Sequence, residues 1–82
     1  MKSKHPKVVK KKLGKERAWG QYHQSSNTIE IDERLRGKKK LEILTHEYLH
    51  HIYPFMDEAA VEKSAKDISD FLWKHDLRFT EI

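Results

Sequence analysis

The sequence of 82 residues contains no cysteine. Disulfide bonds, thiol redox chemistry and a thiolate zinc site are therefore excluded, and a bound metal would need histidine and carboxylate ligands. Long apolar runs are missing as well: none approaches the roughly 18 residues of a membrane span, and the first residues lack the apolar core of a secretory signal. We therefore expect a cytoplasmic protein without membrane contact.

The short length indicates a single domain covering residues 1–82, just above the size at which one hydrophobic core suffices without disulfides or metals. A metal that binds only the folded chain would add measurably to the stability of such a domain. Neither an internal repeat nor a linker divides the sequence, and we expect a monomer.

Positive charge is concentrated at the N-terminus. Residues 1–17 carry eight of the 17 lysines and arginines and one acid, which leaves nine bases and twelve acids for residues 18–82. Such a basic arm can attract nucleic acid or an acidic partner without reading a sequence. Lysine-rich segments without interleaved aromatic residues are weak evidence for such binding, and a solubilising edge strand is the simpler interpretation.

The spacing of apolar residues predicts strands in the first part of the chain. "VVKKKL" at residues 8–13 is expected to form an edge strand guarded by its lysines, followed by a turn at Gly14 and Lys15. "RAWGQYHQ" at residues 17–24 is expected to be extended, with a turn at residues 25–27 closing a hairpin. "TIEID" at residues 28–32 alternates strictly, so its isoleucines should face the core.

The period becomes helical from Gly37 onward. Pro54 must end this first helix by Tyr53, and Asp57 is a suitable N-cap for a second one. The expected buried stripes are Leu41, Leu44, Tyr48 and Ile52 on the first helix, and Val61, Ala65, Ile68 and Leu72 on the second. Strands followed by helices predict a small α+β domain.

The motif "HEYLH" at residues 46–50 is the chemically informative part of the sequence. His46 and His50 are four residues apart, so on a helix their rings emerge from one face and can bind a single zinc ion. Glu47 is rotated off that face and can accept a proton from a water molecule without being a ligand. This HExxH pattern therefore favours a hydrolytic zinc site over a chance pair of exposed histidines.

A catalytic zinc usually has three protein ligands, and two glutamates can supply the third. Glu58 and Glu62 are four residues apart on the second helix, so both can point at the first. Alternatively, Glu58 only complements the helix dipole and Glu62 is a solvated acid. His51 lies on the same side of the first helix as Glu47, where it is a supporting partner of the site, a substrate contact or a solvated side chain.

The strand "TIEID", the motif "HEYLH" and the segment "EAAVEKSA" together resemble the gluzincin metallopeptidases. The similarity is to their smallest members, the minigluzincins, and to the ImmA/IrrE-like and small phage-encoded metallopeptidases. The resemblance spans roughly Trp19 to Trp73 and is specific only at HExxH and the acidic helix. It implies a zincin-like fold with a short antiparallel or mixed sheet of about three strands packed on an active-site helix and a C-terminal helix.

The resemblance also implies roles for individual residues. His46, His50 and Glu58 would be the zinc (Zn²⁺) ligands, and Glu47 the general base. Glu62 would support a zinc-binding histidine or replace Glu58 as the ligand. The family's additional transition-state donor has no unique counterpart here.

Three residues are possible donors in the transition state: Tyr22, His23 and Tyr53. A peptide or protein substrate is expected to bind along the edge of the strand formed by Thr28, Ile29, Glu30, Ile31 and Asp32. The implied function is zinc-dependent endopeptidase activity. Two alternatives remain: a zinc-stabilised binding or regulatory protein whose basic arm contacts nucleic acid or an acidic partner, and a peptidase kept latent until its termini are trimmed or moved.

Overall fold

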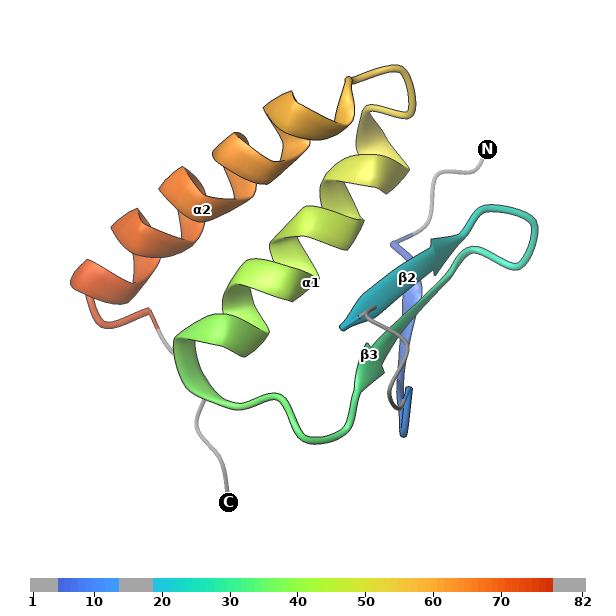
Figure 1. Ribbon diagram of the computed structural model, residues 1–82, viewed down its shortest axis with the longest axis horizontal. Helices are drawn as coiled ribbons and strands as arrows, with labels where there is room; N and C mark the ends of the chain where they lie inside the picture. Colours follow the sequence, from blue (N-terminus) through green and yellow to red (C-terminus); the bar gives the residue numbers. More distant parts are fainter. Residues whose placement is uncertain (1–4, 14–18, 78–82) are drawn as a thin grey trace.

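A computed structural model describes residues 5–13 and 19–77, which form a three-stranded sheet and two helices (Figure 1). The elements are, in chain order, β1 (Lys7–Lys11), β2 (Gly20–His23), β3 (Thr28–Asp32), α1 (Gly37–Ile52) and α2 (Glu58–Lys74). α1 lies between α2 on one side and the sheet on the other. The expected α+β class is confirmed, whereas the turn expected at Gly14 and Lys15 lies outside the described residues, as do residues 1–4 and 14–17 of the basic arm.

The sheet is mixed and has the strand order β1-β3-β2. β1 runs parallel to β3, and β2 runs antiparallel to it through the hairpin expected at residues 25–27. Val8 and Tyr22 are the partners of Ile29 on its two sides, so all three side chains share the face toward the helices. The lysine-rich segment is therefore an edge strand, as the sequence predicted.

The central position of β3 overturns the expectation about substrate binding. Every residue from Thr28 to Ile31 is paired with both β1 and β2, and the backbone N–H of Asp32 donates to the carbonyl of Trp19. The backbone of β3 therefore has no free edge along which a peptide could bind, and the predicted substrate strand is wrong. Among the described strands, β1 and β2 form the edges, and α1 packs against β2 and β3.

Two groups of buried residues hold the layers together. Ile29, Ile31 and Leu35 are packed against the inner face of α1, as predicted for the two isoleucines. Between the helices the buried residues are Leu49, Val61 and Ala65. The small side chains on α2 allow the two helices to approach closely.

One residue of each predicted apolar stripe is exposed. Ile52 is 40% exposed and Ile68 is 39% exposed, so the prediction is wrong at these positions. Ile52 is the last residue of α1, and both side chains line a groove that the described elements leave open. Periodicity identifies the apolar side of a helix, but it does not show how far a neighbouring element extends along it.

The first turn of α1 contains three lysines that oppose the helix dipole. The unfavourable interaction of Lys38 with the helix dipole is offset by its ion pair with Asp70 of α2. Asp70 also pairs with Lys66. These contacts connect the start of α1 to the last turns of α2. Neither described helix is both long enough and apolar enough to cross a membrane.

Asp32 is buried, with 1% of its surface exposed, although its place in the alternating strand suggested the solvent side. Both of its carboxylate oxygens accept hydrogen bonds of 2.8 Å from the Arg34 guanidinium, and it accepts others from the backbone N–H groups of Arg34 and Leu13. The hydrogen bonds from Arg34 hold the pKa of Asp32 well below its usual range. The residue thereby joins the end of β3 to the segment after β1.

The low pKa of Asp32 predicts a specific sensitivity to acid. The folded state binds fewer protons than the unfolded state near the ordinary aspartate pKa, so the free energy of unfolding should fall as the pH drops below about 4. Asp32→Asn should be less stable at neutral pH and should lose much of this dependence. Urea unfolding at several pH values measures both effects. Glu33→Gln, which removes a neighbouring exposed carboxylate, is the control, and an equal response of the two variants would contradict this role of Asp32.

Candidate metal centre

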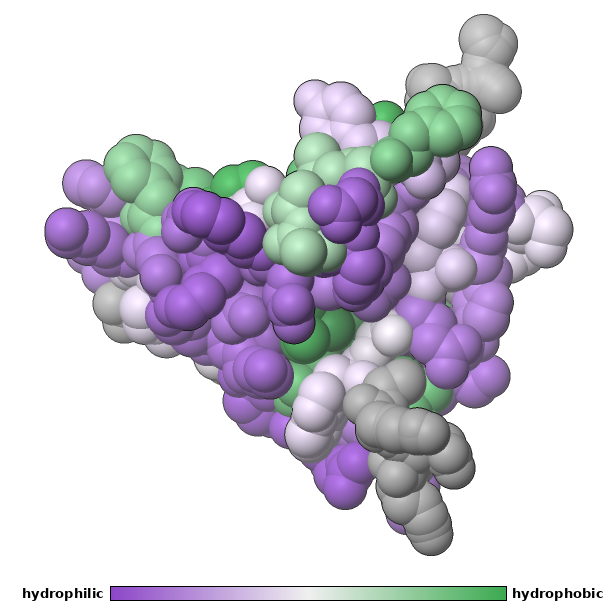
Figure 2. Space-filling view, turned by 45° about the horizontal axis from the view of Figure 1, so that its top comes forward, coloured by the Kyte–Doolittle hydropathy of each residue, from purple (hydrophilic) through white to green (hydrophobic). Residues whose placement is uncertain are grey.

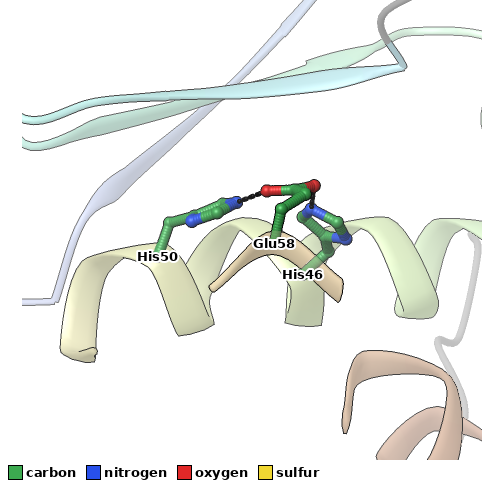
Figure 3. A group of neighbouring side chains, drawn as sticks. All are labelled: His46, His50 and Glu58. Atoms are coloured by element: carbon green, nitrogen blue, oxygen red, sulfur yellow. Dashed lines mark hydrogen bonds and ion pairs between the residues drawn. The ribbon is translucent and has the colours of Figure 1, made fainter. Parts of the chain in front are cut away.

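Three side chains from the two helices meet at one point in Figure 3. The carboxylate of Glu58 lies between two histidine rings, with Oε2 at 3.0 Å from His46 Nε2 and Oε1 at 3.1 Å from His50 Nε2. One possible ligand atom from each residue lies within 4.8 Å of those from the other two. The described residues contain no other group of three histidine or acidic side chains that meets this condition.

The local structure follows from the sequence on both sides of the site. The four-residue spacing brings His46 and His50 to one face of α1, with ring centroids 5.0 Å apart. The Asp57 side chain accepts a hydrogen bond from the backbone N–H of Ala59 and so begins α2 at Glu58, as predicted. The packing of Val61 against Leu49 then brings the first turn of α2 close to the histidines.

The donor set fits a zinc ion. Two imidazole nitrogens and one carboxylate oxygen are the three protein ligands of a common class of catalytic zinc site, which leaves one position open. The contacts of Glu58 with both rings also mean that its carboxylate can compensate charge on either histidine when no metal is bound. Sequence reasoning left Glu58 and Glu62 as alternatives, and the geometry brings Glu58 to the histidines.

Glu47 lies beside this group and is buried, with 8% of its surface exposed. Burial raises the pKa of its carboxyl group above the usual glutamate range; the charge of His50 opposes this shift, and that of Glu58 adds to it. Successive residues of an α-helix are rotated by about 100°, so Glu47 does not share the helix face of His46 and His50. Its side chain is directed toward Gly20 of the sheet instead. A buried carboxylate with a raised pKa is suited to accept protons.

Gly20 explains how β2 can approach this carboxylate so closely. A Cβ atom at this position would lie 2.7 Å from Ile43 Cγ2, 3.2 Å from Glu47 Cγ and 3.3 Å from the carbonyl oxygen of Glu30. The first contact is shorter than normal packing allows. Sequence reasoning missed this residue, although a glycine within a strand is a known sign of close backbone approach.

Substitution of Gly20 should therefore cost stability. Gly20→Ala is expected to lower the free energy of unfolding by about 1–3 kcal/mol, because the added methyl group overpacks the space beside Ile43 and Glu47. Chemical denaturation measures this loss. Ile43→Leu removes the methyl group nearest to the new Cβ, so it should restore part of the stability in the double variant. A stable Gly20→Ala protein would show that the contact with Ile43 does not constrain β2.

Two hollows flank the three possible ligands, and Glu47 borders both of them. One hollow, of about 330 Å³, contains His46 and Glu58 in its wall together with Trp19, Glu42 and Glu62. The other, of about 390 Å³, contains His50 in its wall together with Tyr22, Gln24 and Pro54. Both hollows are also lined by residues of β2 or its neighbours, Trp19 and Gly20 in the first and Tyr22 and Gln24 in the second. Open space therefore extends along β2 on either side of the site.

Comparisons of the chain with protein-family models, with curated proteins and with solved structures find no match. The chemical interpretation therefore rests on the residues and their geometry.

The three candidate donors lie in different places. Tyr22 lines the hollow beside His50; its hydroxyl lies 2.9 Å from His51 Nδ1 and donates to Asn27 Oδ1 at 3.2 Å. His23 Nε2 lies 3.2 Å from Glu30 Oε1, and the strand register puts both side chains on the sheet face opposite the helices. Tyr53 follows the end of α1 and is half-exposed. Of the three candidates, Tyr22 shares a hollow with Glu47 and His50, and its side chain is in contact with His51.

Proposed function

We propose that this protein is a zinc-dependent endopeptidase with a gluzincin-type site, in which His46, His50 and Glu58 hold the metal. The observation that carries the proposal is the position of the Glu58 carboxylate, at 3.0 and 3.1 Å from the two histidines of the HExxH motif. The buried Glu47 next to this group supports hydrolysis over a purely structural metal site, because a structural site needs no base.

Each residue has a defined task in this mechanism. A zinc ion held by the three ligands would supply a Lewis acid that polarises the scissile carbonyl and lowers the pKa of a nearby water. Glu47 accepts the proton of the attacking water and then passes it to the leaving amine. Its burial beside the proposed ligands and its place in the walls of both hollows support this task.

The substrate strand is reassigned from β3 to the outer edge of β2. Within the described part of the chain, no strand pairs with this edge. A peptide in extended conformation that bound there would extend the sheet and place its side chains toward the two hollows. Gly20 supports this arrangement, because it allows the strand to lie directly against Glu47.

Tyr22 is the best-placed donor to the developing oxyanion. It lines the same hollow as Glu47 and His50, and its hydroxyl lies 2.9 Å from His51 Nδ1. The single proton of this hydroxyl, donated to Asn27 in the unliganded protein, can turn to a carbonyl oxygen at the site. Hydrogen bonds that form only in the transition state accelerate the chemical step.

Removal of this hydroxyl gives a direct test of the donor. Tyr22→Phe should lower kcat on the order of 10²-fold, the usual effect of losing one oxyanion donor, with little change in zinc content. Tyr53→Phe removes a hydroxyl from the same kind of side chain away from the hollows and should keep full activity. Steady-state kinetics on a quenched-fluorescence peptide measure both variants. Equal rates for Tyr22→Phe and the wild type would remove Tyr22 from the mechanism.

The proposed function is tested on the full chain loaded with zinc. An unstructured protein such as casein, and the chain itself, serve as substrates, because a domain this small can be restricted to its own termini or to one partner. Cleavage that stops on adding a chelator and resumes with added zinc supports the proposal. A chain with full zinc content that cleaves neither substrate contradicts it and favours a binding protein or a latent enzyme.

A further inference from the structure

A further recess, a groove, lies on the side of α1 away from the metal ligands. It has a volume of about 540 Å³ and is lined almost entirely by apolar groups of the sheet and both helices, among them Val8, Ile29, Tyr48, Ile52 and Ile68. On α1, Tyr48 and Ile52 are each two residues from His50, which corresponds to about 200° around the helix. The groove is therefore separate from the site of the proposed peptidase and does not share its lining residues.

The connection between the helices carries a projecting apolar group close to this groove. Phe55 is 97% exposed, and the neighbouring Tyr53 is half-exposed. Ile52 lines both the groove and the shallow hollow formed by the connection, so the two apolar areas are continuous. In Figure 2, green surface gathers over the connection between the helices.

We propose that two copies of this chain form a symmetric dimer in which Phe55 of each copy inserts into the groove of the other. A two-fold axis requires a surface that is complementary to itself, and one chain here carries both the projecting group and the recess. The recess is in the size range that accommodates whole small-molecule ligands, so an aromatic ring fits it. A solvent-exposed phenylalanine beside such a recess gains by this burial.

The exposed apolar area supports a second copy as the occupant. An aromatic side chain buries about 150–250 Å², so Phe55, half of Tyr53 and the exposed parts of Val8, Ile52 and Ile68 give roughly 500 Å² per copy. Two copies together bury about 1,000 Å², the lower limit for a specific interface, so we expect a weak and reversible dimer. The monomer expected from the sequence would then prevail only at low protein concentration.

Sedimentation equilibrium of the full chain over a wide concentration range tests the dimer. The wild type should show a reversible monomer–dimer equilibrium, and Phe55→Asp should raise the dissociation constant by about 30-fold or more, as expected for an interface hot spot. Phe71→Asp is the matched control, since Phe71 is 60% exposed on α2 and lines neither the groove nor the hollow at the connection. It should leave the dissociation constant unchanged. Melting curves establish that both variants fold.

Mixing two impaired variants tests the insertion itself. Phe55→Asp lacks the projecting ring, and Ile68→Asp places a charge in the groove, so each variant alone loses both contacts of the symmetric dimer. A mixture can form a heterodimer with one intact contact, and it should associate more strongly than either variant alone. A monomeric wild type at all concentrations, a dimer insensitive to Phe55→Asp, or a mixture no stronger than its components would each overturn the proposal.

Discussion

Glu47→Gln is expected to lower the rate of peptide hydrolysis by about two to four orders of magnitude, the usual effect of losing a general base. Glutamine has nearly the same size and keeps a carbonyl oxygen, but it cannot accept the proton of the attacking water. The side chain is directed toward Gly20 and the sheet, so zinc content should not change. Thermal stability should also be nearly unchanged, because a neutral amide is no harder to bury than this carboxylate.

The same measurement separates an enzyme from a zinc-stabilised binding protein. Glu42→Gln is a matched control, because Glu42 is also on α1 and lines the hollow beside His46, yet it does not belong to the group of possible ligands. It should retain activity within a few-fold of the wild type. If Glu47→Gln cleaved as fast as the wild type, the proposed mechanism would be wrong even with zinc bound. Loss of zinc in this variant would instead assign Glu47 to the ligands.

The elements of the fold could be predicted because their information is local. The alternation of Ile29 and Ile31, the proline at position 54 and the capping residue Asp57 each act within a few residues of the chain. HExxH is also local, because one helix fixes the relation of His46 to His50.

The order of the strands could not be predicted in this way. Alternation shows that β3 has a buried face, but it does not show which strands lie on its two sides, because those contacts join distant parts of the chain. The misassigned substrate edge follows from this limit. Burial of Asp32 was missed for a related reason, since the segment with Leu13, whose backbone N–H donates to Asp32, reaches it only after β1 and β3 pair.

The choice between Glu58 and Glu62 also depends on tertiary structure. Their spacing puts both on one side of α2, and local rules cannot decide which turn of that helix lies beside the histidines. The connection of residues 53–57 is short and α2 begins at Glu58, so the first turn lies next to the C-terminal half of α1. Glu58 thereby reaches both rings, while Glu62 lines the neighbouring hollow.

Removal of zinc is expected to produce a large loss of thermal stability. A ligand that binds only the folded state at 1,000 times its dissociation constant stabilises it by about 4 kcal/mol. In a domain of this size each kcal/mol shifts Tm by roughly 4–8 °C, so a chelator should lower Tm by roughly 15–30 °C. Differential scanning calorimetry with and without a chelator measures the shift, and elemental analysis gives the stoichiometry, which we expect to be one zinc per chain.

Single alanine variants identify the residues whose binding of zinc causes the change in Tm. His46→Ala, His50→Ala and Glu58→Ala should each lose most of the bound zinc and most of the chelator-dependent change in Tm, because two remaining ligands hold the ion weakly. Each variant is compared with its own metal-free form, since Glu58→Ala also removes two ion pairs that exist without metal. Glu62→Ala is the matched control, one helical turn further along α2, and should keep its zinc. Retention of zinc in Glu58→Ala with loss in Glu62→Ala would transfer the third ligand to Glu62, and an unchanged Tm with no zinc in the wild type would end the metal proposal.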